Sequence, residues 1–430
     1  MRCLQKREHS MNMSEIKKSN KNEVVNNTLM LMIFNLARML FPLIILPYLT
    51  RVLTVETFGA IAFTKAIISY LFLIVDFGFM LSATKEVVEA LQSKKKIGEI
   101  VGNTTVARLF LSIIGLVVMV ALTTTVELLD GFLLYMILSY VSVVLSIFFF
   151  EFLFRGMSMM HVITYRFITM RTISTSLMFV FVRSDEHILW IPILDILGTV
   201  IALLLVYWEM RKLELKVSIT NFTDIWRSIK SSSLYFLSQA SSLSFSALNT
   251  LLLGIMLSAR EIAYWSISLQ LINAVQGFYT PITSGVYPTM VRTKELRLIK
   301  KELMIFMPII VLGCVTSFVL APVIIRILTG DEFYGAIFTF RLMIPLLVLA
   351  FPAMLFGWPS LGAIGKVKTN TMITVASAIF QIVGLLLLIV LGRFTLINVI
   401  WLRVLTEAVM LGLRLMALVK YRHEFADSQS

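Results

Sequence analysis

The sequence predicts an all-α polytopic membrane protein with about twelve transmembrane helices in two six-helix lobes. Three observations lead to this fold class. Of the 430 residues, 58% are hydrophobic and only 15% are charged, and the mean hydropathy of +0.89 is far above that of soluble domains. Apolar segments of about 20 residues, the length that a helix needs to cross a bilayer, recur along the whole chain. Strongly basic connections also alternate with short, nearly uncharged ones.

The apolar segments give twelve predicted spans, numbered here in chain order. The first six begin near Thr28, Thr57, Glu99, Leu128, His161 and Ile188. The last six begin near Ser233, Glu261, Glu302, Tyr334, Thr369 and Thr395. A polar, basic stretch precedes span one, which is too long for a signal-peptide core, so we expect that span to be retained as an anchor.

Basic residues are distributed very unevenly between the two sides of the predicted membrane. Of the 38 lysines and arginines, eight lie within the spans and 25 lie in the tails and connections on the side of the N-terminus. This positive-inside bias supports the span count and places both termini in the cytoplasm. The connections on the other side hold only five basic residues, namely Arg51, Arg183, Arg260, Arg326 and Arg393.

The longest polar interruption after the N-terminal tail runs from Glu209 to Lys230 and divides the spans six and six. We therefore expect it to link two lobes. The predicted organisation is a cytoplasmic basic tail at 1–26, an N-terminal lobe at 27–208, a cytoplasmic linker at 209–231, a C-terminal lobe at 232–419 and a cytoplasmic tail at 420–430.

Several kinds of chemistry are excluded by composition and spacing. Cys3 and Cys314 are the only cysteines, and the four histidines are scattered, so neither a disulfide framework nor a metal or cofactor site is predicted. Gly362 to Lys366 has the wrong spacing for a phosphate-binding loop. The net charge of +13 follows from topology and gives no reason to expect nucleic acid as a partner. The outer connections are too short to carry catalytic groups, so we do not expect an enzyme.

The charges inside the spans are strongly unbalanced. A central charge costs about 2.5 to 3.5 kcal/mol on the insertion scale, so eight lipid-facing cations would cost roughly 20 kcal/mol or more. At most three one-to-one pairs are possible, which leaves about five cations without an acidic partner in the spans. This excess indicates an anionic cargo. The cations are Arg38, Lys65, Arg108, Arg166, Arg171, Arg341, Arg403 and Arg414, and the acids are Asp76, Asp195 and Glu407.

Position within each span separates these cations. We expect Arg38, Lys65, Arg108 and Arg171, in spans one, two, three and five, to line a cavity. In the alternative interpretation, buried acids or backbone carbonyls hold some of them. Arg166 and Arg414 lie nearer the cytoplasmic ends, from which long side chains reach the interface.

The remaining charges have a second interpretation. Arg403 and Glu407 stand four residues apart and share one helix face, so they either neutralise each other or exchange partners during proton or ion coupling. Arg341 and Asp195 are single charges in the outer parts of spans ten and six, where a structural role is also possible, and Asp76 lies near the cytoplasmic end of span two.

Small residues and prolines mark spans one, seven and eight. Close helix packing explains the repeat of Ser238, Ser242 and Ser246 in span seven, and sugar contacts are the alternative. Interrupted helices often surround a transport pathway, although simple kinks also explain prolines. The prolines that interrupt spans one and eight are Pro42, Pro47, Pro281 and Pro288.

The hairpin of spans one and two has a distinctive sequence. It reads Pro42, then Pro47-Tyr48-Leu49-Thr50-Arg51-Val52-Leu53, Glu56-Thr57-Phe58-Gly59, Asp76-Phe77-Gly78-Phe79 and Ser82-Ala83-Thr84-Lys85. Together with Phe154-Arg155-Gly156 and Tyr287-Pro288, this hairpin resembles the Wzx-type polysaccharide flippases, relatives of the MATE exporters in the multidrug/oligosaccharidyl-lipid/polysaccharide exporter superfamily. Two positions depart from the family pattern, with Thr54 in place of a common glycine and Arg155 in place of a usual glutamine.

The resemblance implies a V-shaped bundle of two lobes in the bacterial inner membrane. Such a protein would move an undecaprenyl-pyrophosphate-linked oligosaccharide, as in O-antigen and lipopolysaccharide biosynthesis, from the inner to the outer leaflet by alternating access. The diphosphate would be the anion that the unpaired cations require. We expect Arg38, Lys65, Arg108 and Arg171 to receive it, with Arg341 and Arg403 facing them from the other lobe.

The resemblance also bears on coupling and partners. Possible coupling residues are Glu407, Asp76 and Asp195, with H⁺ or Na⁺ as a counter-ion and a polysaccharide polymerase of the same pathway as a possible protein partner. A MATE-type drug or cation antiporter is the main alternative, but it would favour buried acids over buried bases. A membrane-embedded polymerase or ligase is the enzyme alternative, and the large outer loop that it requires is absent from the sequence.

Overall fold

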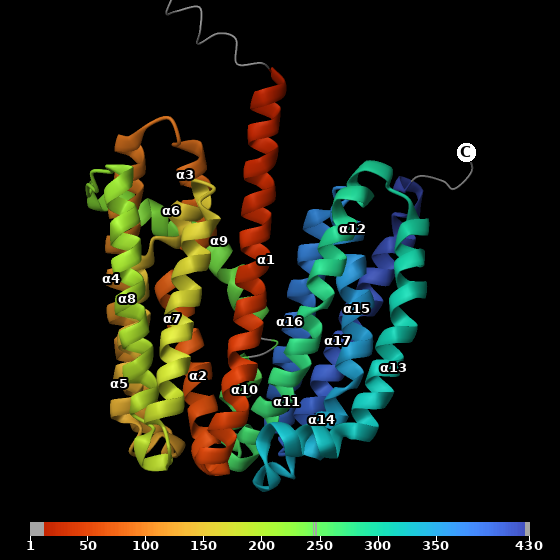
Figure 1. The fold of residues 1–430 in the computed structure, drawn as a ribbon. Coiled ribbons are helices and arrows are strands. Elements are labelled where there is room, and N and C mark those ends of the chain that lie inside the picture. Colours follow the sequence, from red (N-terminus) through yellow and green to blue (C-terminus); the bar gives the residue numbers. More distant parts are fainter. Residues whose placement is uncertain (1–12, 244, 246, 426–430) are drawn as a thin grey trace, which may run out of the picture.

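The computed structural model describes residues 13–243, 245 and 247–425. Within this part of the chain every regular element is a helix, and the helices stand side by side in two upright bundles (Figure 1). Among the described residues, nine helical segments are long and apolar enough to cross a membrane. The protein is therefore an all-α polytopic membrane protein, as the sequence predicts.

The first bundle contains the first half of the chain, and each predicted span corresponds to one helix or to consecutive helices. Span one is α1 (Met13–Val52), which begins well inside the predicted tail. The other helices are α2 (Val55–Asp76), α3 (Phe79–Glu89), α4 (Lys94–Thr125), α5 (Leu133–Ser146), α6 (Glu151–Gly156), α7 (Met160–Phe181) and α8 (Trp190–Leu213).

The second bundle begins after a short non-helical linker, and its first helix starts within the predicted linker at Phe222. Its helices are α9 (Phe222–Leu243), α10 (Ala247–Met256), α11 (Ala259–Gly277), α12 (Tyr279–Thr293), α13 (Leu296–Thr329), α14 (Ala336–Met343), α15 (Pro345–Leu355), the π-helix η6 (Phe356–Gly362), α16 (Val367–Val390) and α17 (Leu396–Lys420).

The helix breaks lie only partly where the prolines predict them. Helix α1 runs through Pro42 and Pro47 without interruption, so the predicted break in span one is wrong. Span eight does break, at Phe278, three residues before Pro281. Span two breaks where Phe77 and Gly78 adopt the left-handed conformation, with φ values of 44° and 81°. A glycine tolerates this conformation without steric cost.

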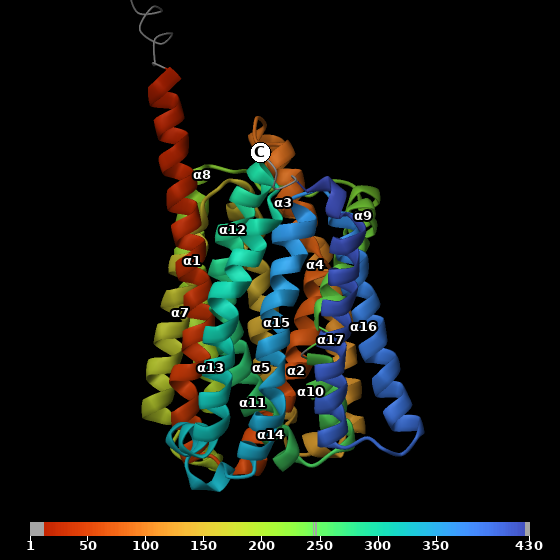
Figure 2. The same ribbon diagram turned by 90° about the vertical axis from the view of Figure 1, so that its right-hand side faces the viewer.

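The start of α1 and the end of α17 lie at the same end of the molecule (Figure 2). Following the predicted orientation, this end is named the inner end and the opposite one the outer end. At the outer end α2 packs against α10 and α11, and we name this closure the outer seal. A Cβ atom at Gly59 would lie 1.8 Å from the carbonyl oxygen of Ala259, and one at Gly254 would lie 2.0 Å from the ring of Phe63. Glycine therefore allows the two bundles to touch closely.

Polar contacts at the rim supplement the outer seal. Glu56 of α2 forms an ion pair of 2.7 Å with Arg260 of α11, and Arg51 donates a hydrogen bond of 2.6 Å to the carbonyl of Ile327 in α13. Thr54, one of the two departures from the family pattern, caps α2 and donates from its hydroxyl to Asp185 at 2.7 Å. Asp185 is thus bound to the span one–two hairpin.

Candidate functional site

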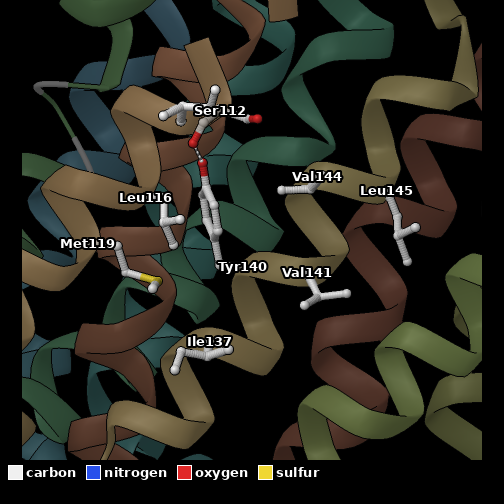
Figure 3. Close-up of a pocket in the computed structure, with 9 residues that line it drawn as sticks. Ser112, Leu116, Met119, Ile137, Tyr140, Val141, Val144 and Leu145 are labelled. Atoms are coloured by element: carbon white, nitrogen blue, oxygen red, sulfur yellow. Dashed lines mark hydrogen bonds between the residues drawn. The ribbon is translucent and has the colours of Figure 1, made fainter. Parts of the chain in front are cut away.

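Two grooves on the molecule have apolar linings, and neither lining includes a charged side chain. A groove of about 270 Å³ runs between α4 and α5, and the hydroxyl of Tyr140 points to the carbonyl of Ser112 at its rim, 2.5 Å away (Figure 3). A second groove of about 370 Å³ lies between α16 and α17 and is lined by residues such as Leu387 and Trp401. Apolar surfaces of this kind favour contact with lipid tails. The candidate polar site therefore lies among the charged side chains of the spans.

Arg108 is in the packed interior of the first bundle. Its guanidinium forms an ion pair of 2.9 Å with Asp76, and only 3% and 2% of the two side chains are exposed. Asp76 ends α2 and also accepts a hydrogen bond from the backbone N–H of Met80 at 3.4 Å. Arg108 therefore has an internal counter-charge and stabilises the break in span two, a position that does not fit the expected role in a cavity.

Arg166 also has an acidic partner that the charge count omitted. Its guanidinium lies 2.9 Å from Glu151, which in turn lies 3.2 Å from Arg155. Arg166 is buried and sits over the ring of Phe149 at 4.0 Å. The expectation that Arg166 reaches the interface is therefore wrong, because a carboxylate at the start of α6 binds it inside the protein.

Lys65, Arg171 and Asp195 meet in the first bundle from three different helices, and we name them the first-bundle cluster. Arg171 of α7 lies 3.1 Å from Asp195 of α8, with 40% and 30% of the two side chains exposed. Ser174 donates to the same Asp195 oxygen at 2.5 Å. Lys65 of α2 is exposed and lies within electrostatic range of both charges. The cluster carries one net positive charge and is reachable from outside the packed core.

Arg38 lies on α1, which stands between the two bundles in Figure 1. Its side chain is exposed, and the guanidinium lies 5.6 Å from the ring centre of Phe34 in the same helix. Among the described residues no acid pairs with it. Within the described part of the chain, no carboxylate lies within ion-pair distance of Arg38 or Lys65, and no backbone carbonyl accepts a hydrogen bond from either side chain. The other span cations have such a partner.

Arg403 and Glu407 form the ion pair that their spacing predicts, at 2.8 Å, and both side chains are largely buried. Arg403 also donates to the carbonyl of Phe245, in the break between α9 and α10, at 3.1 Å. Nearby, Gln381 donates to Asn249 at 2.8 Å. The pair therefore belongs to a buried polar network that joins α10, α16 and α17.

Arg341 satisfies a carbonyl that a proline has released. Its Nε donates to the carbonyl of Phe318 in α13 at 2.9 Å. Phe318 stands four residues before Pro322, which has no N–H to donate, so that carbonyl has lost its partner within the helix. Arg341 therefore binds the backbone of α13, which belongs to the second bundle, as Arg341 itself does.

Arg414 has the same kind of partner. It donates to the carbonyl of Ala353 at 2.6 Å and to the hydroxyl of Thr374 at 3.1 Å. Its guanidinium lies beside Gly357, the residue with non-helical angles in η6. Arg414 is buried, so the expectation that it reaches the interface is wrong. Backbone carbonyls therefore bind all three of these arginines: Arg341 beside a proline inside α13, Arg403 at the break between α9 and α10, and Arg414 near the end of α15.

Two residues at these sites, Glu151 and Ser174, were not predicted from the sequence. Glu151 lies at the border of predicted span four and was not counted with the buried acids. Ser174 is three residues after Arg171, which places both on one helix face, and this spacing could have indicated it. The side chains of Ser238, Ser242 and Ser246 lie outside the described residues. Within the described part of the chain no group of three metal-ligating side chains lies together.

Comparison with known proteins adds the family context. Residues 24–294 match the family described as "Polysaccharide biosynthesis protein". The "Putative O-antigen transporter" of Escherichia coli strain K12 is 27% identical over 342 residues, which cover 76% of this chain and 81% of that protein. A protein of the same name from Shigella dysenteriae is 29% identical over 264 residues, covering 61% of this chain and 66% of the relative.

Solved structures share the architecture at low sequence identity. An inward-facing multidrug-resistance MATE transporter of the MOP superfamily superposes with a TM-score of 0.68 at 14% identity, covering 91% of this chain and 95% of that one. An outward-facing structure of a MATE transporter gives 0.59 at 16% identity, covering 94% and 96%. These likenesses establish a common fold.

Proposed function

The chain belongs to the polysaccharide biosynthesis protein family, as a Wzx-type member of the MOP superfamily, and on this premise we propose that it is a lipid-linked oligosaccharide flippase. Its cargo would be an undecaprenyl-pyrophosphate-linked repeat unit of O-antigen or a similar surface polysaccharide. Movement would be from the inner to the outer leaflet of the bacterial inner membrane, with both termini in the cytoplasm.

The first-bundle cluster is the observation that supports this cargo. A lysine binds phosphate as a point charge, and an arginine binds it through a planar fork of donors. Asp195 lies 3.1 Å from one terminal nitrogen of Arg171, and the ammonium of Lys65 has no ion-pair or hydrogen-bond partner among the described residues. The proposed phosphate site is therefore Lys65 and Arg171, assisted by Arg38 on α1.

The other predicted site residues receive different roles in this proposal. Arg108 has Asp76 as its internal counter-charge, and Arg341 and Arg403 are bonded to backbone carbonyls. We therefore do not include these three arginines in the phosphate site.

Coupling to an ion is a separate part of the proposal. Asp76 and Glu407 are largely buried and each is bonded to an arginine, whereas Asp195 is partly exposed beside Arg171. Of the three candidates, Asp195 is best placed to exchange a proton, because protonation would release Arg171 to bind phosphate. An inside-negative potential also favours outward movement of an anion, by roughly 2.3 kcal/mol per charge per 100 mV.

Alternating access would require the two bundles to rock about the cluster, so that it faces each side in turn. The outer seal would open in one of these states. A drug or cation antiporter would instead need an acid that is free to bind a cation. Each of the span carboxylates Asp76, Asp195, Glu407 and Glu151 is bonded to an arginine, which favours the anionic cargo.

The proposal is tested in cells that lack the gene and are complemented with variants. Lys65→Met should leave lipid-linked repeat units in the inner leaflet, whereas Lys65→Arg, which keeps the charge, should restore export. Lys85→Met is the matched control, because Lys85 is exposed and paired with Glu89. Export at the wild-type rate by Lys65→Met at normal protein level would contradict the phosphate site. Unpolymerised units already displayed outside in the deletion strain would indicate a polymerase instead.

A further inference from the structure

Helix α9, the inner half of span seven, packs mainly against α2, α3 and α4 of the first bundle, although its sequence opens the second, and it makes a smaller contact with α16 of the second bundle. Ile225 is buried in a cluster whose other members include Phe79 of α3 and Val101 of α4. The hydroxyls of Ser232 and Ser82 lie 2.6 Å apart in the buried interface. Helix α9 therefore completes the inner core of the first bundle.

The break in span two provides the surface on which α9 lies. The ring of Phe236 stacks on that of Phe77, with centres 4.6 Å apart and planes within 19°. A Cβ atom at Gly78 would lie 2.6 Å from the backbone nitrogen of Phe236. The Asp76-Phe77-Gly78 motif thus combines a turn in span two with a site of close backbone approach for α9.

The linker before α9 is also fixed to the first bundle. The N–H of Ser218 donates to the carbonyl of Gly98 at 3.2 Å, and Asn103 exchanges hydrogen bonds with Thr220 at 2.8 and 3.0 Å. A Cβ atom at Gly98 would lie 2.1 Å from the carbonyl oxygen of Lys216. These backbone contacts bind residues 216–220 along α4.

Two buried hydrogen bonds join helix α10, the outer half of the same span, to the second bundle. Asn249 accepts a hydrogen bond from Gln381 of α16, and Trp265 of α11 donates to Thr250 at 2.9 Å in a buried setting. Towards the first bundle, Gly254 of α10 packs against the apolar ring of Phe63. Lipid tails can replace an apolar contact at little cost, whereas a buried hydrogen bond that loses its partner leaves an unsatisfied polar group.

We propose that α9 moves with the first bundle and α10 with the second when the outer seal opens. The boundary between the two moving bodies then lies inside span seven, where α9 is followed by α10, and not in the polar linker that precedes α9. This inference rests on the proposed alternating access of the two bundles. In this proposal the Asp76-Phe77-Gly78 motif and the linker keep α9 bound to the first bundle during the movement.

The test uses engineered disulfides in a background that carries Cys3→Ser and Cys314→Ala. The pair Ser82→Cys with Ser232→Cys would join α3 to α9, and hydroxyls 2.6 Å apart are close to the sulfur separation of about 2.05 Å in a disulfide. The control pair, Glu56→Cys with Arg260→Cys, would instead fix the outer seal. Each single-cysteine variant under the same oxidant reports on folding and on oxidation damage.

Two readouts separate this inference from the proposed cargo. The first is export of lipid-linked repeat units, and the second is labelling of Ala259→Cys in the outer seal by a membrane-impermeant maleimide. The oxidised α3–α9 pair should keep both at the level of the reduced protein, whereas the oxidised control pair should lose export. Loss of labelling on oxidation of the α3–α9 pair would overturn the inference. If labelling stays unchanged but none of the variants exports repeat units, the inference about α9 is upheld and the proposed flippase function is contradicted.

Discussion

Removing one partner of the Arg108 and Asp76 ion pair should destabilise the first bundle strongly. In Arg108→Met the carboxylate of Asp76 would stay in a site where only 2% of it is exposed, without its counter-charge. Leaving such a charge unpaired costs about 3 to 5 kcal/mol. Since about 1 kcal/mol shifts the unfolding midpoint by 2 to 4 °C in a unit of 150 to 250 residues, we expect a fall of roughly 6 to 20 °C.

Removing both charges should be much less harmful than removing one. Replacement of a buried pair by apolar side chains of similar volume is often neutral or stabilising, by about 1 to 4 kcal/mol. The double variant Arg108→Met with Asp76→Leu should therefore unfold at a higher temperature than either single variant. Loss of the contact between Asp76 and the N–H of Met80 should keep it somewhat below the wild type.

The assay is thermal unfolding of the purified protein in detergent, followed by the fraction that still elutes as a monodisperse species. Arg171→Met is the matched control, because it removes an arginine from a similar ion pair whose side chains are 40% and 30% exposed. This control should keep its thermal stability while losing export. The reasoning would be refuted if Arg108→Met unfolded at the wild-type temperature but lost export, since Arg108 would then act on the cargo.

Three further predictions concern the proline in α13, the outer seal and the turn in span two. Arg341→Leu should cost roughly 1 kcal/mol of stability, because it leaves the carbonyl of Phe318 unpaired. Adding Pro322→Ala should recover most of the loss, because the new N–H can bond to that carbonyl. Equal unfolding midpoints for the single and the double variant in a thermal melt would contradict this role of Arg341. Glu56→Arg should loosen the outer seal through repulsion from Arg260, and adding Arg260→Glu should restore it. Maleimide labelling of a cysteine in the seal measures both effects. Equal labelling of the single and the double variant would show that this ion pair does not stabilise the seal. Gly78→Ala should cost at least about 1 to 2 kcal/mol from its left-handed backbone alone, and a wild-type melting temperature would show that the turn relaxes.

Local patterns predicted the fold well. Hydropathy and the alternation of basic connections located the spans because both properties are set within about 20 residues of chain. The same holds for the pair of Arg403 and Glu407, which one helix turn brings together. Even the polar α7 was located, although it is not among the nine segments that satisfy the hydropathy criterion.

The partners that most buried cations bind could not be predicted from the sequence. Asp76 and Arg108 stand 32 residues apart on different helices, so their contact depends on how the helices pack. Arg341 binds a carbonyl, a group that every residue has and that only the missing N–H of Pro322 makes available. A comparison of acidic and basic side chains alone counts such arginines as unpaired and therefore overestimates the number that await an anion.

The outer seal has a consequence for the energy difference between the closed and open molecule. Glycine contacts such as that of Gly59 with Ala259 are made of dispersion forces, which lipid tails supply almost as well, and Glu56 and Arg260 are both more than half exposed to solvent. We expect a closure of this composition to lie nearer in free energy to its open form than a closure held by buried ion pairs would. A cargo then needs only a modest preference for one state to change which of the two predominates.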